Sequence, residues 1–178
     1  RPAIWLARRD DLAETWTVLK ILRWTADYFR QKGIDSGRLD AELLLADTLG
    51  LDRVGLYLNF DRPLTADELT HLRERVARRS RREPLQYILG TTEVWSLEFT
   101  VRPGVLIPRA DTETLVEEAL KRATPAGAIL DIGTGSGIIA VALAHELPEA
   151  TVTGVDVSAV ALEVAAENAR DNGVERRV

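Results

Sequence analysis

The stretch ILDIGTGSGIIAV, residues 129–141, restricts the possible folds more than any other part of the sequence. An apolar run reaches an acid at Asp131, meets glycines at Gly133, Gly135 and Gly137, and becomes apolar again. This pattern predicts a buried strand that turns sharply into a helix, because glycine tolerates positive φ and allows close approach to the backbone. Backbone amides and the positive end of the helix dipole would then point toward one place. We expect a nucleotide-like ligand there; a glycine-rich turn without a ligand is the simpler alternative.

Three classes of ligand compete for such a loop. A mononucleotide P-loop requires lysine after its last glycine, and no lysine follows Gly137. The dinucleotide fingerprint requires glycine at position 138, where Ile138 stands. The remaining pattern, D-x-G-x-G-x-G, resembles motif I of the class I S-adenosylmethionine methyltransferases.

The end of the next predicted strand supplies a second acid. Asp156 lies 19 residues beyond Gly137, where a carboxylate can accept hydrogen bonds from the two ribose hydroxyls of an adenosine-containing cofactor. S-adenosylmethionine and NAD share this ribose, so the acid alone does not separate them. The alternative interpretation is that Asp156 or Ser158 caps the following helix.

The first part of the chain carries helical periodicity. Apolar residues at three- and four-residue steps predict helices over residues 15–31, 38–49, 54–58 and 65 to about 82. In the second helix Leu39, Leu43 and Ala46 are expected on the buried face. Thr65 and Glu68 form a capping box that opens the third long helix. We therefore expect a small all-helical unit at the beginning of the chain.

The period of the pattern changes after Pro84. Residues 94–101 alternate between apolar and polar side chains, which predicts a half-buried strand, one arm of a hairpin. Helices are then expected at 112–122, 137–147 and 158–172, and strands at 128–132 and 151–155. Apolar strands that alternate with helices indicate a parallel sheet covered on both faces. Two strands are few for such a sheet, so we expect the fold to be incomplete.

Composition excludes several kinds of site. The chain has no cysteine and only two histidines, so we expect neither disulfides nor a metal site. Residues 1–110 hold 18 basic and 16 acidic side chains, whereas residues 111–178 hold 5 and 12. The acidic second part is a poor surface for nucleic acid. No apolar run is long enough to cross a bilayer and the beginning is a poor secretory signal, so we expect a cytoplasmic protein.

Three segments narrow the interpretation further: EPLQYILG at 83–90, EVWSLEFTVRPGVLIPRADTETLVEEAL at 93–120, and RLDAELLLA at 38–46. They resemble the protein-(glutamine-N5) methyltransferases that modify peptide chain release factors. The resemblance implies an α/β Rossmann-like class I methyltransferase fold, incomplete here, preceded by a small all-α domain and a β-hairpin linker. The implied boundaries are a substrate-docking domain at 1–83, the linker at 84–108, and the first part of the methyltransferase domain at 109–178.

The resemblance also implies an activity: methyl transfer from S-adenosylmethionine to the side-chain amide nitrogen of the glutamine in the GGQ tripeptide of a release factor. The release factor would be the protein partner, and the enzyme would be a monomer. By position, the implied cofactor-binding residues are Gly133, Thr134, Gly135, Ser136, Gly137 and Asp156, with Asp131, Phe99 and Arg109 close by. Two alternatives stay open, since Phe99 could be a core aromatic residue and Arg109 could form a structural ion pair with Glu113.

The family holds its target amide with an N-P-P-Y motif, and this motif does not occur in the 178 residues. We expect it beyond Val178, so no catalytic residue is assigned and the chain alone is expected to be inactive. Other interpretations are a methyltransferase for a different amide or amine, and a non-catalytic cofactor-binding or docking module. An NAD-dependent oxidoreductase is disfavoured by Ile138 and by the linker segments.

A basic run, RERVARRSRR at residues 73–82, contains six arginines. On a helix Arg75, Arg78, Arg79 and Arg82 share one face. One interpretation is that this face contacts a release factor or ribosomal RNA. The other is a solvated helix face whose arginines favour the helix C-terminus.

Overall fold

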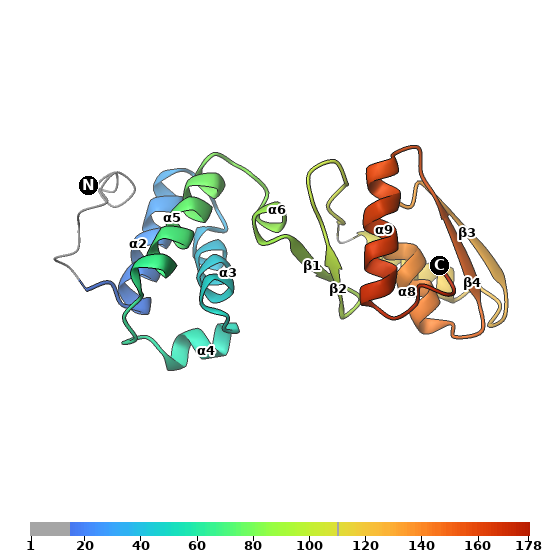
Figure 1. Ribbon diagram of the computed structural model, residues 1–178, viewed down its shortest axis with the longest axis horizontal. Helices are drawn as coiled ribbons and strands as arrows, with labels where there is room; N and C mark the ends of the chain where they lie inside the picture. Colours follow the sequence, from blue (N-terminus) through green and yellow to red (C-terminus); the bar gives the residue numbers. More distant parts are fainter. Residues whose placement is uncertain (1–14, 110) are drawn as a thin grey trace. The chain divides into compact units, whose positions relative to one another are not determined.

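The computed structural model describes residues 15–109 and 111–178, and the chain divides into two compact units, residues 1–89 and 90–178 (Figure 1). The expected functional boundaries at 83/84 and 108/109 stay predictions. The first unit is helical over its described residues, with these elements: α2 Val18–Gln31, α3 Gly37–Leu49, α4 Arg53–Leu58, α5 Ala66–Ser80 and α6 Leu85–Leu89.

Local sequence signals explain where these helices begin and end. Thr17 caps α2 by accepting a hydrogen bond from the amide of Lys20 at 3.4 Å. The capping box of Thr65 and Glu68 is present at the beginning of α5, as the sequence predicted. Helix α3 ends at Gly50, whose φ of 62° lies in the left-handed region that glycine adopts at low cost.

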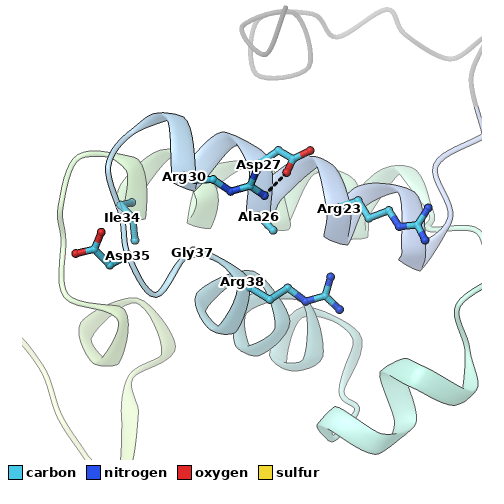
Figure 2. Close-up of a pocket in the computed structure, with 8 residues that line it drawn as sticks. All are labelled: Arg23, Ala26, Asp27, Arg30, Ile34, Asp35, Gly37 and Arg38. Atoms are coloured by element: carbon cyan, nitrogen blue, oxygen red, sulfur yellow. Dashed lines mark hydrogen bonds and ion pairs between the residues drawn. The ribbon is translucent and has the colours of Figure 1, made fainter.

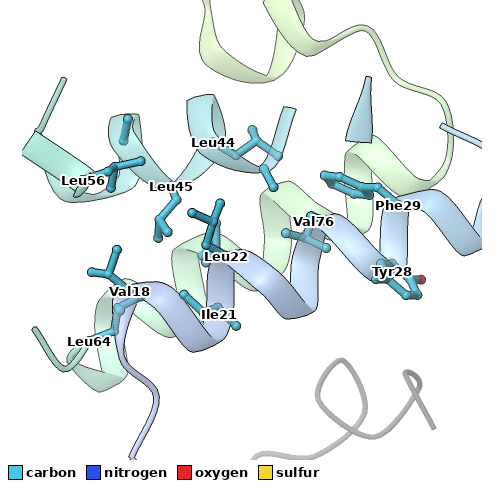
Figure 3. Packing of buried hydrophobic residues seen from close by; sticks show 14 of the residues in the cluster. Val18, Ile21, Leu22, Tyr28, Phe29, Leu44, Leu45, Leu56, Leu64 and Val76 are labelled. Atoms are coloured by element: carbon cyan, nitrogen blue, oxygen red, sulfur yellow. The ribbon is translucent and has the colours of Figure 1, made fainter. Parts of the chain in front are cut away.

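The core of the helical unit lies among α2, α3 and α5 (Figure 3). Its apolar side chains come from every helix of the unit and are almost completely shielded from water. The largest of them are Phe29, Ile21, Leu22, Leu44, Leu45, Leu56 and Leu72. Gly37 lets α3 approach α2, because an added Cβ would lie 2.9 Å from the Cβ of Phe29.

The expected buried face of α3 was right for Ala46, which is 5% exposed, and wrong for Leu39. Leu39 is 44% exposed, whereas Ala41 and Leu44 are buried together with the acids Asp40 and Glu42. The physical reason is that α3 packs against α2, α4, α5 and α6, so it is covered on several sides and has no single apolar stripe.

Helix α6 was not expected, because residues 84–108 read as a connector. Its apolar residues Leu85, Ile88 and Leu89 nevertheless have helical spacing, and Ile88 packs into the helical core. Pro84 stands at the beginning of this turn and its carbonyl accepts hydrogen bonds from the amides of Tyr87 and Ile88. Proline is well suited to a first helical turn, so Pro84 begins the helix rather than opening an extended segment.

The second unit contains a hairpin followed by alternating helices and strands. Its elements are β1 Thr91–Val94, β2 Leu97–Thr100, α7 Asp111–Leu120, β3 Ala128–Ile132, α8 Ile138–Glu146, β4 Thr151–Val155 and α9 Ala159–Asp171. Strands β3 and β4 pair in parallel, with Ile129 opposite Val152. Among the described residues, therefore, the sheet is the two-stranded parallel one that the pattern predicted.

The hairpin differs from its prediction. Residues 94–101 are not one continuous strand, because Trp95 and Ser96 have φ values of 56° and 57° and form the turn between β1 and β2. Both arms of the hairpin are thus present. The alternation of side chains continued through a two-residue turn, which hid the turn from a reading of period alone.

The expectation that helices cover both faces of the parallel sheet was wrong for the described residues, which cover one face. Ile129 and Val152 point into a core with α8, and both α8 and α9 contact β4 on that side (Figure 1). On the other face Leu130 is 59% and Ile132 78% exposed. The expected fold class, a helical domain followed by an incomplete Rossmann-like fold, is confirmed.

Candidate cofactor site

The glycine loop follows β3 and is held against the end of β4. The amides of Gly133 and Thr134 both donate to the carbonyl oxygen of Val155, at 2.8 and 3.0 Å. The amide of Gly137 then donates to the carbonyl of Thr134 at 2.8 Å, which closes the loop before α8 begins. Among the described residues, the buried Ser136 amide has no protein acceptor, so it is free to bind a ligand.

Glycine is required at the three loop positions for different physical reasons. Gly133 and Gly135 have φ values of 78° and 57°, and an added Cβ would meet no heavy atom closer than 4.0 Å at either position. The conformation requires glycine there, and the absent side chains leave the backbone open. At Gly137 an added Cβ would lie 2.9 Å from Cα and Cβ of Ala165. Gly137 therefore permits close packing of α8 and α9.

Asp156 joins the loop to the end of β4. Its carboxylate accepts hydrogen bonds from the amides of Gly135 and Ser158, each at 2.9 Å. The backbone amides of Ser158 and Gly135 hold the pKa of Asp156 below its ordinary value. Asp156 is therefore ionised at neutral pH and keeps lone pairs on both oxygens. The cap of α9 is Ser158, whose hydroxyl accepts from the amide of Ala161.

Asp131 supports the loop from beneath. Its carboxylate accepts a hydrogen bond from the hydroxyl of Thr134 at 2.8 Å. The buried Thr134 side chain lies against Gly154 of β4, where an added Cβ would be 2.9 Å from its hydroxyl oxygen. Gly154 is a residue that sequence reasoning missed, although a glycine inside a strand often marks such a close approach.

A pocket of about 330 Å³ opens beside the loop. One wall is the segment after the hairpin, at Gly104–Leu106 and Pro108, and the other consists of the glycine loop and the starts of α8 and α9. Of the expected site residues, Gly133, Thr134, Gly135, Ser136 and Asp156 line this pocket. The structure thus brings together a glycine-rich backbone, a carboxylate and an apolar wall from Ile138 and Ile139.

Four expected residues do not line the pocket: Gly137, Asp131, Phe99 and Arg109. Phe99 is fully buried in a core with Val94 and Val116, as its alternative interpretation required. The described residues contain no ion pair between Arg109 and Glu113. Instead, Glu113 accepts a hydrogen bond from the amide of Trp95 at 2.9 Å, and Arg109 is exposed. Roles of these residues in ligand binding stay predictions.

Asn168 is the other residue that sequence reasoning missed. It lies on α9, is 1% exposed, and its side chain hydrogen-bonds to Ser136 of the loop and to Thr100 of β2. A single asparagine in a helix gives no pattern signal, because its partners are 32 and 68 residues away.

The basic run on α5 is largely used inside the helical unit. Arg75 pairs with Asp47 at 2.6 Å, Arg78 with Glu83 at 2.5 Å, and Arg79 with Asp40 at 2.7 Å. Arg82 donates to the carbonyl of Lys32. The interpretation as a solvated helix face is confirmed only in part: Arg78 and Arg79 lie in the last turn of α5, but these guanidinium groups also connect α5 to neighbouring segments. Contact of this helix with a release factor or RNA stays a prediction.

The helical unit has a larger hollow, of about 620 Å³, along α2 and α3 (Figure 2). Arg30 and Asp27 on its edge bind each other at 2.5 Å, as Figure 2 shows. Arg38 donates to Glu42 at 2.6 Å. Much of the charge around this hollow is thus neutralised locally. The pocket beside the glycine loop is better suited to a cofactor.

Two further features are absent from residues 15–109 and 111–178. No group of three or more histidine, aspartate or glutamate side chains could hold a metal ion. No helix within these ranges is long and apolar enough to cross a membrane.

Comparison with known proteins agrees with this architecture. Residues 20–90 match the PrmC N-terminal domain and residues 99–178 match the methyltransferase small domain. Similar proteins include release factor glutamine methyltransferases of Geobacter sulfurreducens, 58% identical over 160 residues, and of Chlorobaculum tepidum, 45% identical over 172 residues. These alignments cover 90% and 93% of this chain but 56% and 58% of the relatives. The chain therefore spans a little over half the length of these relatives.

The resemblance seen in the three sequence segments is confirmed by these matches. Both domain models occur in the order that the two structural units follow, and the boundary between the models falls close to the division at residues 89 and 90. The chain therefore carries a PrmC N-terminal domain followed by a methyltransferase small domain, and it is similar to release factor glutamine methyltransferases over about nine tenths of its length.

Proposed function

We propose that the pocket beside the glycine loop binds S-adenosylmethionine and that the complete catalytic unit methylates the glutamine of the GGQ motif in peptide chain release factors. The observation that carries the proposal is the arrangement of Gly133, Gly135 and Asp156 around one pocket in a methyltransferase small domain. The names of the relatives support the substrate.

The pocket suits an adenosine-containing cofactor for three reasons. The ionised Asp156 can accept hydrogen bonds from two ribose hydroxyls. The free amide of Ser136 offers a donor to a carboxylate or another polar group, and the N-terminal end of α8 adds positive potential. Ile138 and Ile139 give an apolar surface for a base or a thioether chain. Ile138 also disfavours a pyrophosphate pressed onto the helix start, which argues against NAD.

S-adenosylmethionine would supply a methyl group that its positively charged sulfur already activates. The residues of this chain then have to bind and orient, because a side-chain amide is a weak nucleophile whose lone pair is delocalised into its carbonyl. Asp156 and the glycine loop would fix the cofactor, and the apolar wall would exclude water. Positioning and electrostatics would supply most of the acceleration, and no strong base is required.

The ligand is tested by isothermal titration of the 178-residue chain with S-adenosylhomocysteine and with NADH. We expect S-adenosylhomocysteine to bind and NADH to bind more weakly or not at all. Binding of NADH alone would overturn the assignment of the pocket and favour an oxidoreductase.

The substrate is tested with a chimera that joins this chain to the remaining part of the Geobacter sulfurreducens relative. Mass spectrometry of a folded release factor after incubation with chimera and S-adenosylmethionine should show one added methyl group on the GGQ glutamine. The 178-residue chain alone serves as the control, and we expect it to be inactive because it contains no N-P-P-Y motif. A methyl group on another amide or amine would redirect the proposal to a different substrate.

We further propose that the helical domain docks the release factor. The internal pairing of Arg75, Arg78 and Arg79 makes them unsuitable as test positions, since their reversal would damage the fold. Arg81 and Arg23 are exposed. Replacing each by glutamate while measuring release-factor affinity tests docking without this complication. Unchanged affinity in both variants would remove arginine-based docking at these two positions.

A further inference from the structure

Asn168 has an unusual position among the buried polar residues of the second unit. Its Nδ2 donates to the carbonyl of Ser136 at 2.8 Å and to the carbonyl of Thr100 at 3.1 Å. Its Oδ1 accepts from the amide of Thr100 at 2.7 Å. Both ends of the side-chain amide are thus engaged, and the side chain is 1% exposed.

One partner lines the pocket, and the other lies four residues before the opposite wall begins. Ser136 is part of the glycine loop, and Thr100 ends β2 just before the segment at Gly104–Pro108 that forms the opposite wall. The residues that follow Thr100 contact α9 at two more points. Arg102 pairs with Glu167 at 2.9 Å, and Val105 packs against Ala161 and Val164.

We propose that Asn168 is a positioning residue of the cofactor pocket. One side chain binds both Thr100, at the end of the hairpin, and Ser136, in the glycine loop. It therefore fixes the distance between the segment after the hairpin and the glycine loop, and so sets the affinity for the cofactor. This inference rests on the proposed function of the pocket. Asn168 acts through the backbone of its two partners and does not itself line the pocket.

The physical reason is the cost of leaving buried polar groups without partners. Removal of the amide would orphan two carbonyls and one amide at once, and each would move toward water or another partner. Thr100 and Ser136 lie on different segments, so these movements would separate the walls. The loop would also lose the restraint that presents its amides before a ligand arrives, and preorganisation is a main determinant of affinity.

Asn172 offers a matched control on the same helix. It donates to the carbonyl of Glu98 at 2.9 Å, so it also ties the hairpin to α9, but it makes no hydrogen bond to the glycine loop. The variants Asn168→Ala and Asn172→Ala therefore both weaken the attachment of the hairpin. Only the first one cuts the connection between the hairpin and the loop.

The test is titration of the 178-residue chain and the two variants with S-adenosylhomocysteine, at a temperature where each is folded by circular dichroism. We expect the affinity of Asn168→Ala to fall roughly tenfold or more, and that of Asn172→Ala to fall by less than about threefold. Affinity of Asn168→Ala within about twofold of the parent, or equal losses in both variants, would overturn the inference.

A second variant covers the case in which Asn168→Ala does not fold. Asn168→Asp keeps the volume but, when ionised, faces two carbonyl oxygens without a donor. We expect weak binding at pH 8.5 and partial recovery at pH 5.5, because a buried carboxyl takes up a proton readily and can then donate one hydrogen bond. Absence of recovery relative to the parent chain over the same pH range would contradict the role.

Failure of the proposed function is distinguished from failure of this inference by the parent chain, which would then not bind S-adenosylhomocysteine at all. Amide exchange without ligand then decides the inference. We expect residues 133–137 to exchange faster in Asn168→Ala than in Asn172→Ala, and equal rates in the two variants would overturn it.

Discussion

In the helical unit the acids Asp40 and Glu42 are buried and bound to arginines, whereas in the second unit Asp156 stands partly exposed at a pocket and binds backbone amides. Glu42 accepts hydrogen bonds from Arg38, Arg53 and Tyr57, which satisfies both of its oxygens. The carboxylate of Asp156 keeps capacity for further donors. The buried acids Asp40 and Glu42 are therefore used to hold the helical unit together, while the carboxylate of Asp156 is left available for a ligand.

Apolar surface differs between the units in a related way. Helix α3 is covered on several sides, but the sheet of the second unit is covered on one face, and Leu130, Ile132 and Val157 are exposed on or beside the other. A sheet face with large aliphatic side chains gains free energy from any partner that covers it. The comparison teaches that α3 is covered by helices of its own unit, whereas the sheet of the Rossmann-like unit has a face suited to additional covering elements.

The largest expected effect separates these two kinds of apolar residue. Ile21 is 0% exposed in the helical core, and Ile132 is 78% exposed on the sheet. Ile21→Ala should lower the free energy of unfolding of the helical unit by about 2–5 kcal/mol, because it leaves a cavity. Ile132→Ala should change that of the second unit by no more than about 0.5 kcal/mol. Hydrogen exchange of peptides from each unit measures both values, and a large loss at Ile132 would show that this face is covered in solution.

The next effect concerns the basic run. Arg79 is 16% exposed and is bound to the buried Asp40, so Arg79→Ala leaves a buried carboxylate without its partner. We expect a loss of about 3 kcal/mol in the helical unit. Arg81→Ala, on the exposed side of the same helix end, should change stability by less than about 0.5 kcal/mol. Chemical denaturation of the two variants checks this, and equal stabilities would mean that the run is a solvated surface after all.

The glycines of the loop give a third comparison. Gly133 and Gly137 have nearly the same φ, 78° and 80°, but only Gly137 has Ala165 at 2.9 Å from an added Cβ. Gly133→Ala should destabilise the second unit by about 1–2 kcal/mol through its backbone conformation. Gly137→Ala should cost more than this, because α8 and α9 would have to separate. Thermal unfolding measures the difference, and equal losses would contradict a packing role for Gly137.

Much of this architecture could be predicted from the sequence because it depends on local patterns. The capping box at Thr65, the strand and glycine loop at 128–137, and the acid at Asp156 are each recognisable within a few residues. The order of helical unit, hairpin and parallel strands follows from changes of period. The predicted lining of the pocket by Gly133–Ser136 also required only that parallel strands end at one edge of a sheet.

What could not be predicted depends on partners far apart in the sequence. Arg79 and Asp40 are 39 residues apart, and Asn168 and Thr100 are 68 apart. Charged and amide side chains read as surface residues until the fold places them against each other. Phe99 is a related case. The alternation of side chains predicted that Phe99 is buried, but it did not predict whether core residues or a ligand would cover the ring. The hairpin turn at Trp95 and Ser96 was hidden because neither residue is the Asn, Asp or Gly that a two-residue turn with positive φ favours.

The fourth effect is on binding rather than stability. Asp156→Asn removes the negative charge that the ribose hydroxyls would meet, and its amide nitrogen cannot accept a hydrogen bond. We expect affinity for S-adenosylhomocysteine to fall about tenfold, with little change in the helical unit. Isothermal titration checks the first value and hydrogen exchange the second. Glu42→Gln, in the helical unit, is the control, because it should leave the affinity for S-adenosylhomocysteine unchanged. A loss of affinity in Glu42→Gln but not in Asp156→Asn would contradict the assignment of the binding carboxylate to the second unit.

The smallest effect is a pH dependence of the helical unit. Burial raises the pKa of Glu42, but hydrogen bonds from Tyr57, Arg38 and Arg53 outweigh it, so the pKa lies below its ordinary value of 4.5. A carboxyl group whose pKa is lower in the folded state stabilises the fold above its unfolded pKa, and loses this contribution as pH falls through its folded pKa. Stability of the helical unit should therefore decrease below about pH 4.5. Glu42→Gln should show a shallower decrease over the same range, because the neutral amide takes up no proton. Chemical denaturation between pH 3 and pH 7 measures the stability of both proteins. Parallel curves would show that the buried acid contributes no pH-dependent stability to the helical unit.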